Sequence, residues 1–203
     1  PDGGEIFDER SEPERFNNSF DNLGNRDSWM AVGQGWADAQ SAPFRGSKGS
    51  QFEGGTRVSA FIRPLNPGES GRISDSLLTV MDVLPTIMDL AGIEESTVNA
   101  TGSAVLPIRG KSFASLLTNT DQAIHQDEYI ALDMGGDSVL MENNWRIVRP
   151  ASANHWELFN MAVDPSETTD LSAEEPEMLA DLVSKYEVHA QATGILRIDM
   201  DEE

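Results

Sequence analysis

Residues 128–193 hold the pattern that most restricts the fold of this chain, namely four short strand candidates followed by a long amphipathic segment. The candidates run from Tyr129 to Met134, Ser138 to Glu142, Trp145 to Arg149 and Trp156 to Asn160. Gly135-Gly136-Asp137 and Asn143-Asn144 separate the first three, as the turns of β-hairpins do. The pattern predicts a small antiparallel sheet.

The amphipathic segment, residues 172–193, predicts a helix. Ser172 and Glu175 fit a capping box, Pro176 falls in the first turn, and Gly194 is placed to end the helix. Apolar side chains recur at helical spacing at Met178, Leu179, Leu182, Val183 and Tyr186. Such a stripe predicts a helix packed on the sheet rather than a cofactor-binding segment.

An earlier part of the chain alternates between strand and helix patterns. Residues 57–63 form a short apolar run that predicts a buried strand. Residues 76–92 predict a helix with Asp82 as its N-cap, Pro85 in the first turn and Gly92 as a left-handed C-cap. A strand followed by a helix is typical of α/β domains.

Composition excludes several classes of function. The 203-residue chain has a formal net charge of -21 and a pI near 4.3, which argues against nucleic-acid binding and disfavours anionic membrane surfaces. No apolar run approaches the roughly 18 residues of a transmembrane helix. The absence of cysteine excludes disulfides, thiolate nucleophiles and cysteine metal sites.

Residues 39–74 are basic, in contrast to the acidic chain as a whole. They hold five basic side chains and two acidic ones, a local charge of +3, together with several glycines. Lys48 in this stretch is one of only three lysines in the chain. The segment is a candidate site for an anionic ligand. The alternatives are a solvated loop or a set of partners for nearby carboxylates, with glycines that serve only the turns.

Three segments, in order and at matching spacing, resemble the arylsulfatases. They are Lys48-Gly49-Ser50-Gln51-Phe52-Glu53-Gly54-Gly55-Thr56-Arg57-Val58, then Thr79 to Gly92, and then Trp156 to Asn160 with Asp164-Pro165-Ser166-Glu167 and Asp170-Leu171. The resemblance covers roughly residues 40–200, and it is to the C-terminal half of that family.

The resemblance implies an alkaline-phosphatase-like α/β fold. We expect residues 1–120 to form the C-terminal part of the catalytic α/β sulfatase domain. Residues 121–203 are then a small α+β subdomain with a four-stranded antiparallel sheet and a C-terminal helix. The four strand candidates and the amphipathic segment within residues 128–193 independently predict the same subdomain.

The family hydrolyses sulfate esters with a formylglycine nucleophile and, usually, a calcium ion. Lys48 stands at the position of a lysine that the family directs at the sulfate, which implies a catalytic and substrate-binding role. Glu53, Gly54, Gly55 and Arg57 are expected to shape the turn and begin the strand. The resemblance places the nucleophile and the metal ligands upstream of position 1.

The sequence therefore predicts a fragment of a sulfatase that is inactive alone and whose partner is a small-molecule sulfate ester. One alternative is a phosphate or phosphonate ester hydrolase of the same superfamily, and another is a non-catalytic binding module if the chain is full length. We expect surface or interface roles for the histidines, His125, His155 and His189. The pattern does not decide between a cytoplasmic and a periplasmic location in a bacterium.

Overall fold

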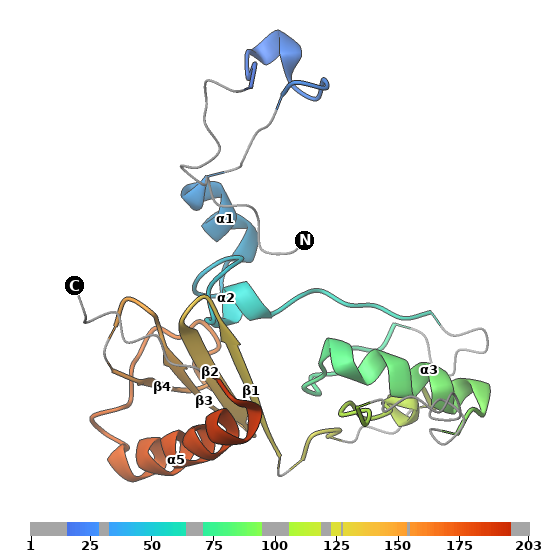
Figure 1. The fold of residues 1–203 in the computed structure, drawn as a ribbon, viewed down its shortest axis with the longest axis vertical. Coiled ribbons are helices and arrows are strands. Elements are labelled where there is room, and N and C mark those ends of the chain that lie inside the picture. The colour runs from blue at the N-terminus through green and yellow to red at the C-terminus, as the bar shows by residue number, and fades with distance from the viewer. Residues whose placement is uncertain are drawn as a thin grey trace. The chain divides into compact units, whose positions relative to one another are not determined.

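The computed structural model describes residues 16–28, 33–63, 71–94, 106–118, 123–126, 128–153 and 155–195 (Figure 1). The chain divides into two compact units. One combines residues 1–59 with residues 129–203, and the other is residues 60–128. The domain boundary between residues 120 and 121 stays a prediction.

A four-stranded antiparallel sheet forms the centre of the first unit, in the order β1-β2-β3-β4. Its strands are β1 (Tyr129–Met134), β2 (Asp137–Glu142), β3 (Trp145–Arg149) and β4 (Glu157–Asn160). Leu140 pairs with Ile147, and Ile147 pairs with Leu158, so apolar side chains meet across neighbouring strands. The four predicted strands are confirmed to within one residue at each end.

One face of the sheet packs against α5 (Pro176–Thr193), as Figure 1 shows. The core between them contains the fully buried side chains of Leu140, Ile147, Leu158, Leu182 and Tyr186. The Tyr186 ring also lies edge-on to Trp156, with centroids 4.8 Å apart. The apolar stripe of this helix is therefore core, as predicted.

The start of α5 differs from the prediction. Glu175 is the N-cap residue, but its side chain makes no capping hydrogen bond. The hydroxyl of Ser172 instead donates to the carboxylate of Asp170 over 2.9 Å, so the predicted capping box is wrong. The end is as predicted, because Gly194 adopts the left-handed conformation at φ 72°.

The opposite face of the sheet packs against α2 (Glu53–Thr56) and the loop before it. A second core there contains Phe52, Val139, Val148 and Phe159. Arg146 lies on the same face of β3 as Val148, because alternate side chains of a strand point the same way. The N-terminal part of this unit adds the 3-10 turn η2 (Phe20–Asn22) and α1 (Gln34–Ser41).

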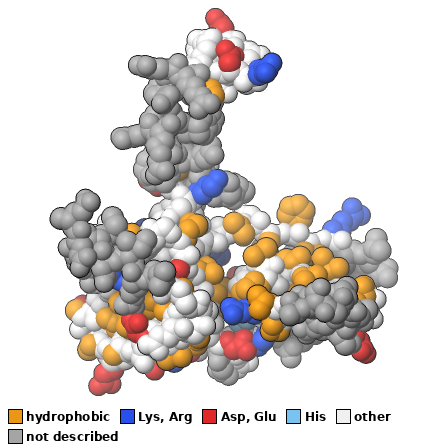
Figure 2. All heavy atoms as spheres, viewed as in Figure 1, with side chains coloured by type: hydrophobic (Ala, Val, Ile, Leu, Met, Phe, Trp, Pro, Cys, Tyr) orange, Lys and Arg blue, Asp and Glu red, His pale blue; other side chains and the backbone are white. Residues whose placement is uncertain are grey.

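The second unit contains the 3-10 turns η3 (Val80–Asp82) and η5 (Ala114–Thr118) and the helix α3 (Val83–Ala91). The helix begins seven residues later than predicted, because residues 76–79 are irregular and Val80–Asp82 form η3. Gly92 ends it at φ 65°, as predicted. Much of its apolar surface is exposed, and Figure 2 shows hydrophobic side chains gathered over this region.

The strand predicted at residues 57–63 is wrong. The segment is extended and exposed, and the side chain of Phe61 is 96% accessible. A strand needs a neighbour for its backbone N–H and C=O groups, and no described segment pairs with this one. Arg57 and Val58 therefore continue α2 as an open segment rather than entering a parallel sheet.

Candidate functional site

Lys48 lies on an exposed turn between α1 and α2. The backbone N–H of Ser50 donates to the carbonyl oxygen of Ser47 over 3.0 Å, which closes the turn. Gly46 and Gly49 have φ of 77° and 99°, a region that favours glycine. The glycines of the sequence thus fold the backbone into a tight turn that presents Lys48 at the surface.

Helix α2 packs directly on the backbone of this turn. A Cβ atom on Gly54 would lie 2.3 Å from the carbonyl oxygen of Gly46, and one on Gly55 would lie 2.2 Å from that of Ser50. The N–H of Gly54 donates to the carbonyl oxygen of Arg45 over 2.7 Å. No side chain fits at either glycine, so Gly54 and Gly55 allow the close backbone approach of the turn, whereas the strand that they were expected to begin does not form.

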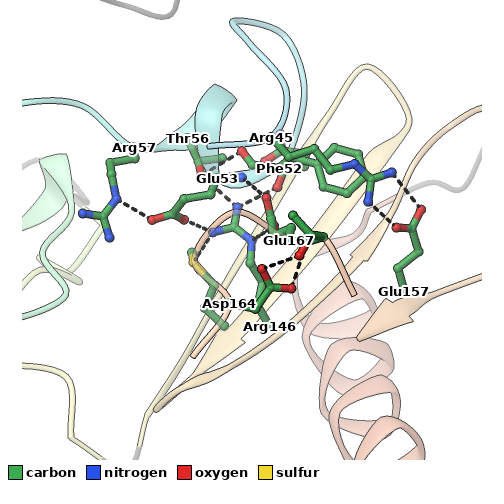
Figure 3. A network of polar contacts seen from close by, with 12 residues as sticks. Arg45, Phe52, Glu53, Thr56, Arg57, Arg146, Glu157, Asp164 and Glu167 are labelled. Carbon is green, nitrogen blue, oxygen red and sulfur yellow. Dashed lines mark hydrogen bonds and ion pairs between the residues drawn. The ribbon is translucent and has the colours of Figure 1, made fainter. Parts of the chain in front are cut away.

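A buried arginine on the sheet holds α2 and the turn in place (Figure 3). Arg146 is 1% exposed and forms an ion pair with the carboxylate of Glu53. Its Nη2 atom donates to the carbonyl oxygen of Gln51 over 2.6 Å and to the hydroxyl of Thr56 over 2.8 Å. Because these partners belong to the turn and to α2, one guanidinium fixes both segments on the sheet.

Glu167 completes this buried network from the C-terminal tail. Its Oε1 lies 3.1 Å from Nε of Arg146, and its Oε2 accepts the backbone N–H of Glu53 over 2.7 Å. Burial raises the pKa of Glu167 to about 7, although Arg146 and the Glu53 N–H act in the opposite direction. Burial also lowers the pKa of Arg146, against the effect of the two carboxylates.

The loop that carries Glu167 is organised by two aspartates. The carboxylate of Asp164 accepts the backbone N–H groups of Thr168 and Thr169 over 2.8 and 2.9 Å. Burial opposes its ionisation, but these hydrogen bonds lower the pKa of Asp164. Asp170 accepts the N–H of Leu158 over 2.9 Å and so joins the loop to β4. Glu167 lies between these aspartates and adopts φ 53°, a conformation that few side chains adopt.

A second ion pair closes the network at its edge. Nη1 of Arg45 lies 2.6 Å from Oε2 of Glu157. The same guanidinium lies 3.8 Å from the ring centroid of Phe52, which meets Phe159 edge-on at 6.4 Å. The turn that bears Lys48 is therefore attached to the sheet by aromatic packing as well as by charge.

Sequence reasoning missed Arg146 and assigned no site role to Glu167. A signal for Arg146 was present, since it is a charged residue among Trp145, Ile147 and Val148 and falls on the same face of β3 as Val148. A charge at such a position needs a buried partner. The identity of the partners is not encoded locally, because Glu53 lies 93 residues away in sequence.

The second unit has its own polar centre at Asp82, which is fully buried. Its carboxylate accepts the N–H of Thr79 over 2.6 Å, the N–H of Lys111 over 2.8 Å and Nε2 of His125 at 2.9 Å. The His125 side chain is only 7% exposed. The prediction for His125 was a surface or interface role. A surface role is wrong, because the ring is buried against Asp82, and an interface role stays a prediction.

The other two histidines lie in the first unit. His155 is exposed, and the ring of half-buried His189 lies edge-on to Tyr129 with centroids 5.9 Å apart. Among the described ranges, no group of three or more His, Cys, Asp or Glu side chains could hold a metal ion. In the part of the chain that the structure describes, no helix is both long and apolar enough to cross a membrane.

Comparison with known proteins shows consistent similarity to sulfatases. An uncharacterized sulfatase of Schizosaccharomyces pombe is 32% identical over 185 residues, which cover 89% of this chain and 33% of that protein. An arylsulfatase of Klebsiella aerogenes is 32% identical over 103 residues, 50% of this chain and 22% of the enzyme. The chain thus spans a third or less of the length of these relatives. No family model matches it.

The crystal structure of Ps i-CgsB is similar in fold. It aligns with a TM-score of 0.61 and 25% sequence identity, over 73% of this chain and 32% of that one. The same protein has been solved in complex with k-i-k-neocarrahexaose, with the same similarity to this chain. The chain that contains the segment around Lys48, α3 and the C-terminal tail is therefore similar to sulfatases in sequence and to Ps i-CgsB in fold.

Proposed function

Because this chain belongs to the sulfatase family, as the C-terminal portion of an arylsulfatase, we propose that it completes an enzyme that hydrolyses a sulfate monoester. In this proposal Lys48 contacts the sulfate group of the substrate. The observation that carries the proposal is the Lys48 turn, which lies at the surface on a backbone held by buried ion pairs.

The chemistry of sulfate ester cleavage calls for a fixed cation. Breaking the S–O bond builds negative charge on the bridging and non-bridging oxygens, and an ammonium group held nearby stabilises that charge. A lysine ammonium is compact and has three N–H donors, so it can contact a leaving oxygen and a sulfate oxygen together. A rigid turn limits the reorganisation that would otherwise reduce this stabilisation.

The network beneath the turn supports a positioning role for its residues. Arg146 and Glu167 are buried and contact the carbonyl oxygen of Gln51 and the backbone N–H of Glu53, and Glu53 is itself a buried residue of α2. They act through the backbone of α2, and we assign them no contact with substrate. Glu53 and Arg57 were expected to shape the turn and begin a strand. No strand follows them at residues 57–63, and the two side chains instead form an ion pair between Nε of Arg57 and Oε1 of Glu53 at 2.5 Å.

Calcium and formylglycine are the groups that the family uses. The described residues do not fit a calcium site, because no group of three or more acidic or histidine side chains among them is arranged so that it could hold a metal ion. The proposal keeps both groups outside this chain, and the chain alone is expected to be inactive.

One run within the chain does match the formylglycine precursor pattern, Cys/Ser-x-Pro-x-Arg. It is Ser11-Glu12-Pro13-Glu14-Arg15, which lies outside the described residues. Peptide mass spectrometry of the expressed protein tests whether this serine is converted to an aldehyde, with loss of two hydrogen atoms. Conversion of Ser11 would show that the nucleophile lies within this chain. An unmodified serine would agree with a nucleophile upstream of position 1, as proposed.

The role of Lys48 is tested by joining this chain to the upstream two-thirds of an arylsulfatase at the matched position. Turnover of 4-nitrophenyl sulfate should fall on the order of 10²–10³-fold in Lys48→Ala, the usual effect of losing one such donor. Lys48→Arg should recover part of it, and exposed Arg63→Ala should have no effect. Unchanged turnover in Lys48→Ala would show that the assignment is wrong. The same assay with 4-nitrophenyl phosphate measures the preference for sulfate.

A further inference from the structure

A small cavity lies beside α2, between this helix and the end of α1. Its volume is about 150 Å³, and its lining includes Ser41, Phe44, Gly54, Arg57 and Ser59. The lining combines a cation, an aromatic ring and two hydroxyl groups. The described residues of the first unit alone form it, and it is distinct from the turn that bears Lys48.

Arg57 supplies the cation. Its Nε is paired with Oε1 of Glu53 at 2.5 Å, and its guanidinium carbon lies 4.7 Å from the ring centroid of Phe44. The two terminal nitrogens point away from the buried network in Figure 3 and make no hydrogen bond to the described residues. The fork is therefore oriented by Glu53 and Phe44, while its outer N–H groups remain available to a ligand.

Ser41 supplies a buried hydroxyl. The residue is 8% exposed, and its Oγ atom has no hydrogen-bond partner among the described residues. Buried polar groups in folded proteins are nearly always paired, and an unpaired one calls for an explanation. A hydroxyl can both donate and accept, so a ligand oxygen in the cavity would satisfy it.

The charge around the cavity favours an anion. Arg57 and Arg146 share the carboxylate of Glu53, and the two cations are close enough for Arg57 to lower the pKa of Arg146. Because Glu53 is shared between two cations, it compensates only part of the charge of the Arg57 guanidinium that lines the cavity.

We propose that this cavity binds a small oxyanion group, a carboxylate or a sulfate, between the Arg57 fork and the Ser41 hydroxyl. A planar guanidinium matches two oxygens of either group, and the Phe44 ring holds it in orientation. The group can belong to the alcohol part of a larger substrate or to a free anion. This inference does not depend on the role of Lys48.

The test is an amide NMR titration of the whole chain with sodium sulfate, sodium acetate and sodium glucuronate at constant ionic strength. Saturable shifts are expected at the amides of Gly54, Arg57 and Ser59. Arg57→Gln should weaken the apparent affinity at least about tenfold, since it removes a charged donor pair. Arg63→Gln, with the same change of charge on an exposed residue outside the cavity, should bind as the parent does.

Ser41→Ala keeps the test decisive if Arg57→Gln fails to fold. The hydroxyl has no internal partner, so its loss should leave the melting temperature unchanged or slightly higher while weakening binding about fivefold. Glucuronate binding more tightly than acetate would identify a substrate substituent, and equal binding would identify a free anion. Shifts that do not saturate, or that persist in both variants, would overturn the proposal.

Discussion

The two compact units bury their apolar side chains to very different degrees. In the first unit, both faces of the sheet are covered, and β2, β3 and β4 contribute side chains with no exposure. In the second unit, the described buried apolar residues are Met88, Phe113 and Leu116, while Val80 is 86% exposed and Ile73 is 90% exposed. Figure 2 shows the resulting apolar surface over α3.

The difference indicates two sources of stability. The first unit has a dense apolar core, worth roughly 25 cal/mol for each Å² of apolar surface buried, together with a buried ion network. The second depends on hydrogen bonds that meet at Asp82, each contributing about 1 kcal/mol net. We expect the second unit to open locally while the first stays folded.

The largest expected effect is the loss of Arg146. Arg146→Ala leaves the buried carboxylates of Glu53 and Glu167 without their shared cation, which should destabilise the first unit by about 3–5 kcal/mol. Urea unfolding followed by the fluorescence of Trp145 and Trp156 measures this change. A cost below about 1 kcal/mol would mean that the network is open to water and does not anchor the turn.

A matched pair of isoleucines contrasts the two units directly. Ile147 is fully buried between the sheet and α5, whereas Ile87 on α3 is 58% exposed. Ile147→Ala should cost about 2–5 kcal/mol, and Ile87→Ala should cost well under 1 kcal/mol. Chemical denaturation of both variants gives the two values. Similar costs would mean that α3 has a buried face in solution.

Sequence patterns predicted the parts of the fold that depend on local signals. The four strands, the apolar stripe of α5 and the left-handed glycines Gly92 and Gly194 follow from alternation, helical spacing and backbone sterics. The failures involve distant partners. Residues 57–63 have the composition of a strand but no described neighbour to pair with. The Ser172 hydroxyl donates to Asp170 and does not cap the helix.

The candidate site shows the same division. The glycines and the turn around Lys48 were predictable, because left-handed turns and close backbone approach require glycine. The ion network beneath it was not, because Glu53, Arg146 and Glu167 come from three separated segments. Burial of His125 was missed for the same reason, since its partner Asp82 lies 43 residues earlier.

The pKa of Glu167 predicts a pH dependence confined to the first unit. Burial raises this pKa from an ordinary 4.5 to about 7, so the folded state binds the proton more tightly than the unfolded state. The free energy of unfolding that protonation of Glu167 contributes should therefore be fully present below pH 4.5. It should fall by up to about 3 kcal/mol as the pH rises through 7.

Glu167→Gln should flatten this profile, because the amide cannot ionise. Asp82, Asp164 and Asp170 have lowered pKa values, so their contributions are lost only as the pH falls below about 3.8, outside this window. Urea midpoints between pH 5 and pH 8 measure the effect. An equally steep decline in Glu167→Gln would assign it to another group.

The smallest expected effect is local to the second unit. Asp82→Ala removes the acceptor shared by Thr79, Lys111 and His125, and the unpaired N–H groups should destabilise α3 by about 2 kcal/mol. Hydrogen exchange should accelerate across α3 and around Lys111, while β2 and β3 keep their protection. Asp75→Ala, the same substitution at an exposed aspartate of the same unit, is the matched control. If exchange in the sheet accelerated equally, the two units would be one cooperative structure, and the contrast in burial would not be a contrast in stability.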